Sequence, residues 1–375
     1  MPKTLTGEEL QLDDGPVRGA QLFLVDGNNL AYRAFFALPE ELQTTDGQPT
    51  NALLGFTNMD VNKCVNFNGP EITSIANGLD DRIKVVVSAH THQPYVCTID
   101  GKLVTSAASF GRVVTGIDLQ LNPAGVVTKA SAVNHIVTQD VTPDPATSAI
   151  LSTYDTLSAP LANRVVGTIS ADITSARQGG QNAAGEQAMG DVIADAMLER
   201  TAPTDFGGAV AAFMNAGGVR ASLLRDQISG GEAVGEVTYA EAFTVQPFGN
   251  TLVVKSCTGQ QLYDVLNQQF NNPAAGSNRI MLPSANVDYH WTTVGGPHIV
   301  DGTLSFDNGA TFVDKAASYQ VVMNNFMADG GDGYTVFRSC TNALGGDVDL
   351  DAFTAYLAAH PNLGPPPLDR IHKDA

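Results

Sequence analysis

The amino-acid sequence predicts a mixed fold of the α+β or α/β class with two or three domains. Its 375 residues are enough for a large buried core. Hydrophobic residues make up 43% of the chain, charged residues make up only 16%, and the 37 glycines indicate many loops. Strand-like apolar runs and segments with helical periodicity follow one another without strict alternation, which favours α+β.

The first half of the chain is expected to form short strands around one helix. Residues 1–20 are acidic and are expected to be a flexible lead, and an apolar strand then ends at Asp26. The helix is predicted because Ile72, Ile75, Ala76 and Leu79 share one face. In chain order, the expected elements are a helix at 70–79 and strands at 83–88, 95–99, 103–106 and 113–121.

The second half begins after a linker at 139–145, which is rich in helix- and strand-breaking residues. Its clearest element is a helix at 186–200, where apolar residues recur at helical spacing. The other expected elements are helices at 146–162, 259–270 and 350–360, and strands at 164–170, 209–214, 251–256, 287–292 and 319–324.

Charge and hydropathy exclude several classes of partner. The chain has 39 acidic and 20 basic residues, and a net charge of −19 repels phosphate backbones, so no nucleic-acid partner is expected. No apolar run approaches the roughly 20 residues of a membrane helix, so no membrane partner is expected. The first ten residues lack the basic and apolar regions of an export signal.

The four cysteines point to an oxidising compartment. None of them forms a Cys-x-x-Cys pair, which argues against a zinc knuckle, and their even number at wide spacing permits two disulfides. We expect the pairs Cys64–Cys97 and Cys257–Cys340, although the sequence leaves the other pairings open.

Two histidines follow a buried strand, one residue apart. In an extended segment His90 and His92 would point to the same side and could face one metal ion. The other five histidines show no ligand spacing and are interpreted as structural or exposed: His135, His290, His298, His360 and His372.

Ala-His-Thr-His at 89–92 resembles the last motif of the metallophosphoesterases, in which Ala89 replaces a glycine. The resemblance implies two divalent metal ions, Zn²⁺ or Mn²⁺, that activate water for attack on phosphorus. The earlier motifs of that family, including its catalytic histidine, do not occur upstream of His90. No catalytic residue is therefore assigned, and we expect weak metal binding and impaired hydrolysis.

A different family is suggested near the N-terminus. The segments 21–36, 44–49 and 54–57 resemble the start of the 5′-nuclease domain of bacterial DNA polymerase I, and this resemblance ends near Met59. It implies a metal-binding role for Asp26. Because the other acidic motifs of that family do not follow, Asp26 is interpreted as a strand-end residue without a metal.

Four motifs beyond the linker resemble the C-terminal domain of the 5′-nucleotidase family. They are the segments 186–195, 215–220, 245–250 and 325–334. The likeness runs from about residue 62 to residue 371 and implies a mixed α/β nucleotide-binding domain. It also implies three parts: a polymerase-like fragment at 1–59, the end of a metallophosphoesterase-type β-sandwich domain at 60–145, and the C-terminal domain at 146–375.

This resemblance also implies roles for residues in the loops. Phe248 and Phe326 would stack on the two faces of a base, because flat aromatic rings favour such contacts. Asn250 would hydrogen-bond the edge of the base, and Asp332 would accept from the ribose hydroxyls. Arg220 would meet the sugar-phosphate end of the substrate.

Two further residues have less defined roles: Asn215 would support the base or its loop, and Arg177 would be a further phosphate-facing arginine. Each role has a structural alternative. A phenylalanine can fill a core, an aspartate between glycines can close a turn, and an arginine can form a surface ion pair.

The first functional hypothesis is a metal-dependent 5′-nucleotidase-type phosphohydrolase that acts on nucleoside phosphates in nucleotide catabolism. The resemblance implies a hinge near helix 146–162 and an extracellular or cell-envelope location. The alternatives are a non-catalytic nucleoside-binding module and a 5′-nuclease based on residues 21–59. Two signatures that meet near residue 60 without a linker also suggest a chimeric N-terminus. The preferred base and the oligomeric state stay open.

Overall fold

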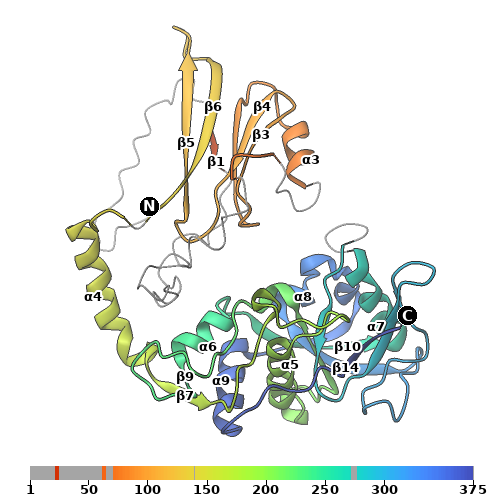
Figure 1. Ribbon diagram of the computed structural model, residues 1–375. Coiled ribbons are helices and arrows are strands. Elements are labelled where there is room, and N and C mark those ends of the chain that lie inside the picture. The colour runs from red at the N-terminus through yellow and green to blue at the C-terminus, as the bar shows by residue number, and fades with distance from the viewer. Residues whose placement is uncertain (1–21, 25–60, 65–70, 139, 272–276, 375) are drawn as a thin grey trace. The chain divides into compact units, whose positions relative to one another are not determined.

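The computed structural model describes residues 22–24, 61–64, 71–138, 140–271 and 277–374. The chain divides into two compact units, Met1–Thr142 and Pro143–Ala375 (Figure 1). The division falls inside the segment 139–145 that the sequence marks as a linker. Asp26 and most of the polymerase-like segment lie outside the described residues.

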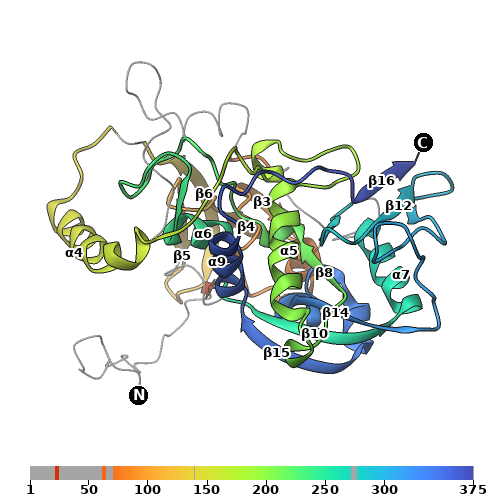
Figure 2. The ribbon, with the colours of Figure 1, turned by 90° about the horizontal axis from the view of Figure 1, so that it is seen from below.

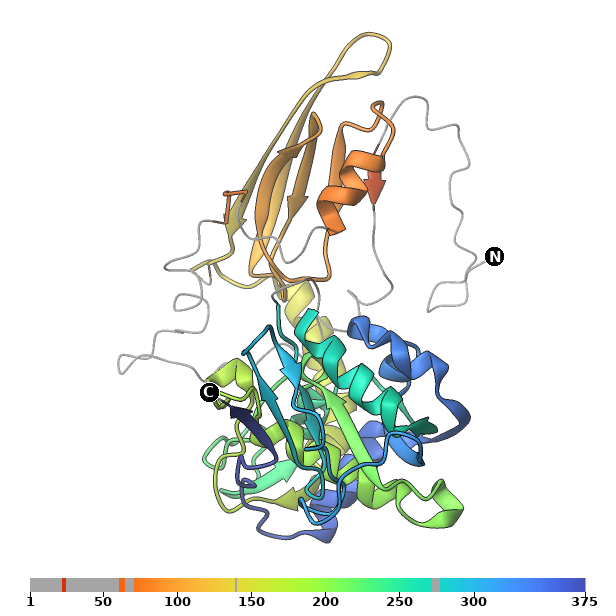
Figure 3. The same ribbon diagram turned by 90° about the vertical axis from the view of Figure 1, so that its right-hand side faces the viewer.

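The first unit contains a four-stranded sheet in the order β1–β2–β4–β3, covered by one helix, α3 (Glu71–Gly78) (Figure 3). Strands β1 and β4 run parallel to β2, and β3 runs antiparallel to β4. A strand from the polymerase-like segment therefore pairs with the strand that precedes the two histidines. The strands are β1 (Leu22–Leu24), β2 (Val85–Ser88), β3 (Tyr95–Ile99) and β4 (Lys102–Ser106).

A long antiparallel ribbon of β5 (Val113–Leu121) and β6 (Val127–Ile136) completes the first unit. The buried side chain of Asn134 anchors it by donating hydrogen bonds to the carbonyl oxygens of Val61 and Ser106 at 2.8 and 3.0 Å. The sequence analysis did not predict β6, because half of its residues are polar and most are exposed.

The second unit begins with α4 (Pro145–Ala162), whose N-terminus is capped by Asp144 and which has no buried residue. A five-stranded sheet follows, in the order β11–β8–β14–β10–β15, and β8 and β14 are its parallel pair. The strands are β8 (Ala211–Asn215), β10 (Thr251–Thr258), β11 (Met281–Pro283), β14 (Ser318–Asn324) and β15 (Thr341–Val348).

Helices cover both faces of this sheet, so the second unit has three layers. On one face, α5 (Ala188–Thr201) and α9 (Asp349–Ala359) lie side by side (Figure 2). On the other face lies α7 (Gly259–Gln268). Neighbouring residues of β8 alternate between the two cores, since Met214 packs with α5 and Phe213 packs with α7. This arrangement agrees with the mixed α/β fold expected from the sequence.

Smaller elements extend the second unit. A two-stranded sheet joins β7 (Val165–Thr168) to β9 (Glu236–Thr238). A three-stranded sheet has the order β13–β12–β16. Its strands are β12 (Tyr289–Thr292), β13 (His298–Ile299) and β16 (Ile371–Asp374), and two short helices are α6 (Tyr239–Val245) and α8 (Asn325–Ala328).

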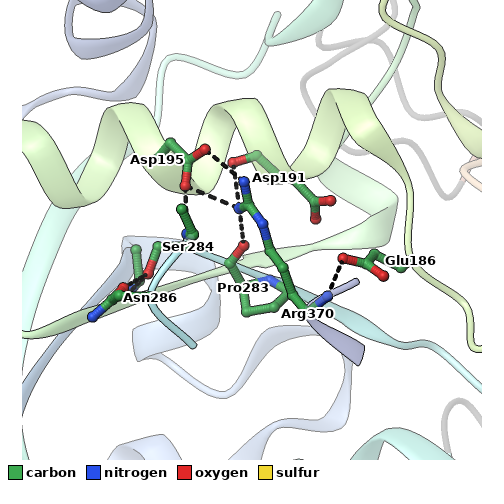
Figure 4. Close-up of polar contacts among 9 residues, drawn as sticks. Glu186, Asp191, Asp195, Pro283, Ser284, Asn286 and Arg370 are labelled. Carbon is green, nitrogen blue, oxygen red and sulfur yellow. Dashed lines mark hydrogen bonds and ion pairs between the residues drawn. The ribbon is translucent and has the colours of Figure 1, made fainter. Parts of the chain in front are cut away.

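Buried Arg370 ties the C-terminal strand β16 to helix α5 (Figure 4). Its guanidinium forms two hydrogen bonds with the Asp195 carboxylate, at 2.9 and 2.8 Å, and donates to the carbonyl oxygen of Pro283 at 2.7 Å. Its backbone N–H donates to Glu186. Burial raises the pKa of the neighbouring Asp191 carboxyl well above its usual value, and Arg370 opposes this increase.

Both expected disulfides are confirmed: Cys64 pairs with Cys97 and Cys257 pairs with Cys340. The first joins the segment before α3 to β3, and the second joins the end of β10 to the start of β15.

In the described part of the chain, no helix has both the length and the apolar character needed to cross a lipid bilayer.

Removing the Cys257–Cys340 bond should destabilise the second unit. The bond closes a span of 83 residues, and a cross-link of this kind contributes about 2–5 kcal/mol to the free energy of unfolding. Urea denaturation of Cys257→Ala/Cys340→Ala should show this loss in the transition of the second unit. The matched variant Cys64→Ala/Cys97→Ala lies in the other unit and should leave that transition unchanged. Equal effects from both variants would contradict the assignment.

A second prediction concerns Asp349, which begins α9 and is 2% exposed. Burial raises the pKa of its carboxyl to about 6, while hydrogen bonds from Leu350 and Asn250 oppose the shift. The folded state therefore binds this proton more tightly than the unfolded state does. The resulting stabilisation is present below about pH 4 and is lost as the pH rises through 6.

Relative to the wild type, Asp349→Asn should gain up to roughly 3 kcal/mol of unfolding free energy between pH 4 and pH 7. Denaturation curves across this range measure the gain. Asp351→Asn removes an exposed carboxylate from the same helical turn and serves as the control. The same gain in both variants would show that burial of Asp349 is not its cause.

Candidate functional site

Three of the loops singled out in the sequence meet at one end of the central sheet. Strands β8 and β14 are parallel, so the loops after Asn215 and Asn324 emerge at the same end. Strand β10 is antiparallel to β14 and starts at this end, where Leu252 pairs with Asn324. The N–H of Thr251 donates to Asn325 Oδ1 at 3.0 Å, which joins the loop before β10 to α8.

Asp332 is held at this sheet end by two partners. Its Oδ2 accepts a hydrogen bond from Asn215 Nδ2 at 2.9 Å, and its Oδ1 forms an ion pair with Arg279. Asn215 is itself held in place, because its Oδ1 accepts from Asn324 Nδ2 at 2.9 Å. The backbone of Asp332 is left-handed, with φ of 52°. A sparsely populated conformation that neighbouring groups enforce is typical of functional sites.

The sequence reasoning missed Arg279 and the partner that positions it. Buried Tyr334 donates its hydroxyl hydrogen to the carbonyl oxygen of Arg279 at 2.6 Å. Arg279 lies 53 residues before Asp332 and belongs to no recognisable motif. Only Asp332 itself indicated such a residue, because a partly buried carboxylate needs a cationic partner.

Arg220 and Phe248 come from different loops and lie together. The Arg220 guanidinium carbon is 5.5 Å from the centre of the Phe248 ring, and Nη1 of Arg220 donates to the carbonyl oxygen of Gly217 at 2.9 Å. Gly217 also touches Asp332, since a Cβ at this glycine would lie 3.2 Å from Asp332 Oδ2. The close approach of these groups explains the glycine at this position.

Phe326 lies on α8 and packs against the backbone of Gly331. A Cβ at Gly331 would lie 2.6 Å from three carbons of the ring, so the glycine makes room for it. Phe326 is 44% exposed and Phe248 is 37% exposed. Neither ring fills a core, which was the structural alternative for both residues.

Two more of the expected residues flank these groups. The carbonyl oxygen of Asn250 accepts from the N–H of buried Asp349 at 2.8 Å, which fixes its backbone next to α9. Arg177 is exposed, and its Nε donates to the carbonyl oxygen of Val219 at 3.2 Å, beside Arg220.

The structure differs from the extended conformation that was expected for the histidine pair, while its metal-binding role stays a prediction. His90 and His92 follow β2 in a turn and have left-handed φ values of 74° and 59°, so they are not two positions of an extended strand. His90 is exposed, and the His92 ring meets Phe110 edge-on at 5.9 Å. Within the described ranges, no third histidine, cysteine or carboxylate lies close enough to complete a metal site with them. A binuclear metal centre does not fit these two residues alone.

Comparisons with known protein families match two parts of the chain. Residues 165–339 match the family model described as "5'-nucleotidase, C-terminal domain", which includes the Asp332, Phe248 and Phe326 loops. Residues 21–85 match "5'-3' exonuclease, N-terminal resolvase-like domain". This second match continues to β2, beyond Met59, where the resemblance was expected to end.

Two curated relatives come from Bacillus subtilis. Endonuclease YhcR is 28% identical over 77% of this chain and 22% of its own length. Trifunctional nucleotide phosphoesterase protein YfkN is 26% identical over 94% of this chain and 23% of its own length. The chain thus spans less than a quarter of either relative.

A solved 5'-nucleotidase precursor from Thermus thermophilus shares the fold, with a TM-score of 0.57 and 24% identity. The likeness covers 77% of this chain and 59% of that one. The family match and the shared fold both concern the second unit: residues 165–339 of this chain are similar to the 5′-nucleotidase C-terminal domain family.

Proposed function

We propose that the second unit binds a nucleoside or nucleotide at this sheet end and serves the hydrolysis of nucleoside phosphates, as a 5′-nucleotidase-type phosphohydrolase. One observation carries the proposal. Residues far apart in the sequence converge there with complementary chemistry: a carboxylate held by Asn215 and Arg279, two half-exposed aromatic rings and a cationic Arg220.

The base is recognised by Phe248 and Phe326. Phe248 lies in the loop before β10 and Phe326 lies on α8 at the same sheet end, and the hydrogen bond from Thr251 to Asn325 joins the start of β10 to the start of α8. A base between two rings gains roughly 1–3 kcal/mol of stacking free energy per contact. Asn250 follows Phe248 by two residues, and its side-chain amide offers both a donor and an acceptor to the edge of the base.

Asp332 and Arg220 recognise the sugar and the phosphate. A carboxylate offers about four acceptor positions, and Asn215 and Arg279 each occupy one on Asp332, so two remain for ribose hydroxyls. Because the Asp332 side chain is only 13% exposed, its hydrogen bonds form in a partly desolvated setting where they are stronger. Arg220 suits a phosphate because its guanidinium can donate two parallel hydrogen bonds.

The metal-dependent step is assigned to no described residue. His90 and His92 lie in a turn with left-handed backbone, and no third ligand accompanies them within the described segments. We therefore derive no catalytic step from this pair, and Zn²⁺ or Mn²⁺ binding there is expected to be weak.

The same observation favours a second candidate function, a non-catalytic nucleoside-binding module. This module would use the same four side chains, Arg220, Phe248, Phe326 and Asp332, and would release no phosphate.

In either case, the partner is a small nucleoside or nucleotide. The two disulfides support an extracellular or cell-envelope location, because such bonds persist in oxidising compartments.

The aromatic contacts are tested with adenosine and isothermal calorimetry. Phe248→Ala and Phe326→Ala should each weaken binding roughly 5- to 100-fold, which is the loss of one stacking contact. Phe312→Ala is the matched control, because Phe312 is 58% exposed in the same unit and belongs to none of the three loops. Unchanged affinity in the double variant Phe248→Ala/Phe326→Ala would remove the base site from this sheet end.

Chelation separates nucleotide binding from hydrolysis. AMP binding should survive EDTA, because the groups assigned to the nucleotide are organic side chains. Phosphate release from AMP with added Zn²⁺ or Mn²⁺ measures turnover and distinguishes the phosphohydrolase from the binding module. Release that disappears in His92→Ala would show that the histidine pair belongs to a working metal centre, against the expectation here.

A further inference from the structure

A second group of polar residues lies on the small sheet that ends the chain, and it shares no residue with the proposed nucleotide site. Strands β12 and β16 run parallel, and His290 is directly opposite His372 in their register. Asp288 precedes β12, and Asp374 ends β16. The two strands therefore carry Asp-Tyr-His and His-Lys-Asp, with the two histidines side by side.

Alternation along the strands places these four side chains on one face. Tyr289, Trp291 and Ile371 point into the core and are at most 3% exposed. Lys373 lies between His372 and Asp374 in sequence, but its ammonium group is 4.9 Å from the centre of the Trp291 ring. The Asp and His side chains keep between 25% and 44% of their surface in solvent.

The polar atoms of the group are already close together. Nε2 of His372 lies 2.9 Å from Asp288 Oδ2, and Nδ1 of His290 lies 2.8 Å from Asp374 Oδ1. The two imidazole rings have centroids 4.6 Å apart and are tilted by 31°. One ligand atom from each of Asp288, His290 and His372 lies within 4.8 Å of the others.

We propose that Asp288, His290 and His372 bind one divalent transition-metal cation, for which Zn²⁺ is the best match. Two imidazoles with a carboxylate are a ligand set that Zn²⁺ accepts and that Mg²⁺ and Ca²⁺ do not favour. In a tetrahedral site with Zn–N bonds of 2.0–2.1 Å, ligand atoms lie about 3.3 Å apart. The three ligand atoms lie within 4.8 Å of one another, so binding requires them to approach by at most about 1.5 Å.

Asp374 completes the arrangement as a partner of a ligand. Its carboxylate accepts from Nδ1 of His290, which leaves Nε2 as the ring nitrogen that is available to a cation. A carboxylate behind a metal-bound imidazole fixes its tautomer and raises its basicity. With both imidazoles neutral, the two aspartates give the group a charge of −2, which a divalent cation balances.

The position of the group suggests what the cation does. Asp288 precedes β12 and His290 belongs to it, while His372 belongs to β16. A bound cation would cross-link β16 to β12 over more than 80 residues of chain. Because the site exists only in the folded state, a bound cation would raise the free energy of unfolding of the second unit.

The test uses the full chain, which is first treated with EDTA to remove bound metal and is then dialysed against Zn²⁺. Excess Mg²⁺ is present during dialysis because it occupies non-specific cation sites on the acidic surface. The wild type should bind about one Zn²⁺ that His290→Gln/His372→Gln loses. His298→Gln/His360→Gln removes two other histidines of the same unit and should retain it. His90→Gln/His92→Gln should retain it as well. Circular dichroism verifies that each variant is folded.

Asp374→Asn should lower the affinity for Zn²⁺ 10- to 100-fold without abolishing binding, as expected for a partner of a metal-bound histidine.

A measurement on the wild type needs no variant. In the histidine NMR spectrum, Zn²⁺ should shift the ring signals of His290 and His372 and should leave the ring signals of His298 and His360 unchanged. The proposal is overturned if the wild type binds no Zn²⁺ under these conditions. Unchanged Zn²⁺ binding by His290→Gln/His372→Gln would overturn it as well. Neither outcome bears on adenosine binding, so this proposal and the nucleotide site fail independently.

Discussion

The parallel pairing of β14 with β8 is the constraint on which the proposed site depends. It sets Val321 and Val322 opposite Ala211 and Ala212 in the middle of a sheet that helices cover on both faces. Two strands that end side by side bring the Asn215 and Asp332 loops together although they are 117 residues apart. The antiparallel start of β10 adds the Phe248 loop to the same end. The proposed binding groups lie at strand ends and are thus positioned by a buried core.

Polar contacts within the loops then refine what the sheet brings together. Asp332 adopts a left-handed backbone because Arg279 and Asn215 hold its carboxylate from two sides, and glycines at 217 and 331 let neighbouring groups approach. Tyr334 fixes Arg279 through its backbone carbonyl. These contacts hold the carboxylate in one position, which would reduce the cost of binding the proposed nucleoside.

The sequence predicted most of the regular core and less of what connects it. Helix α5 was found because its apolar residues recur at helical spacing, and strand β10 was found because it contains a short apolar run. Strand β15 was missed because it is exposed and contains Gly345 and Gly346. The role of Arg279 and the pairing of His290 with His372 were missed for another reason: each depends on a partner more than 50 residues away. The left-handed turn at His90 and His92 could not be read from an apolar run followed by His-x-His.

The most direct test of the central claim locates the base itself. Intermolecular nuclear Overhauser effects can be measured between the H2 and H8 protons of bound adenosine and selectively labelled phenylalanine rings. The account predicts contacts from the purine to both Phe248 and Phe326, and to no other phenylalanine. The absence of contacts to both rings would contradict it. Contacts that occur only to residues outside the Asn215, Phe248 and Asp332 loops would contradict it as well.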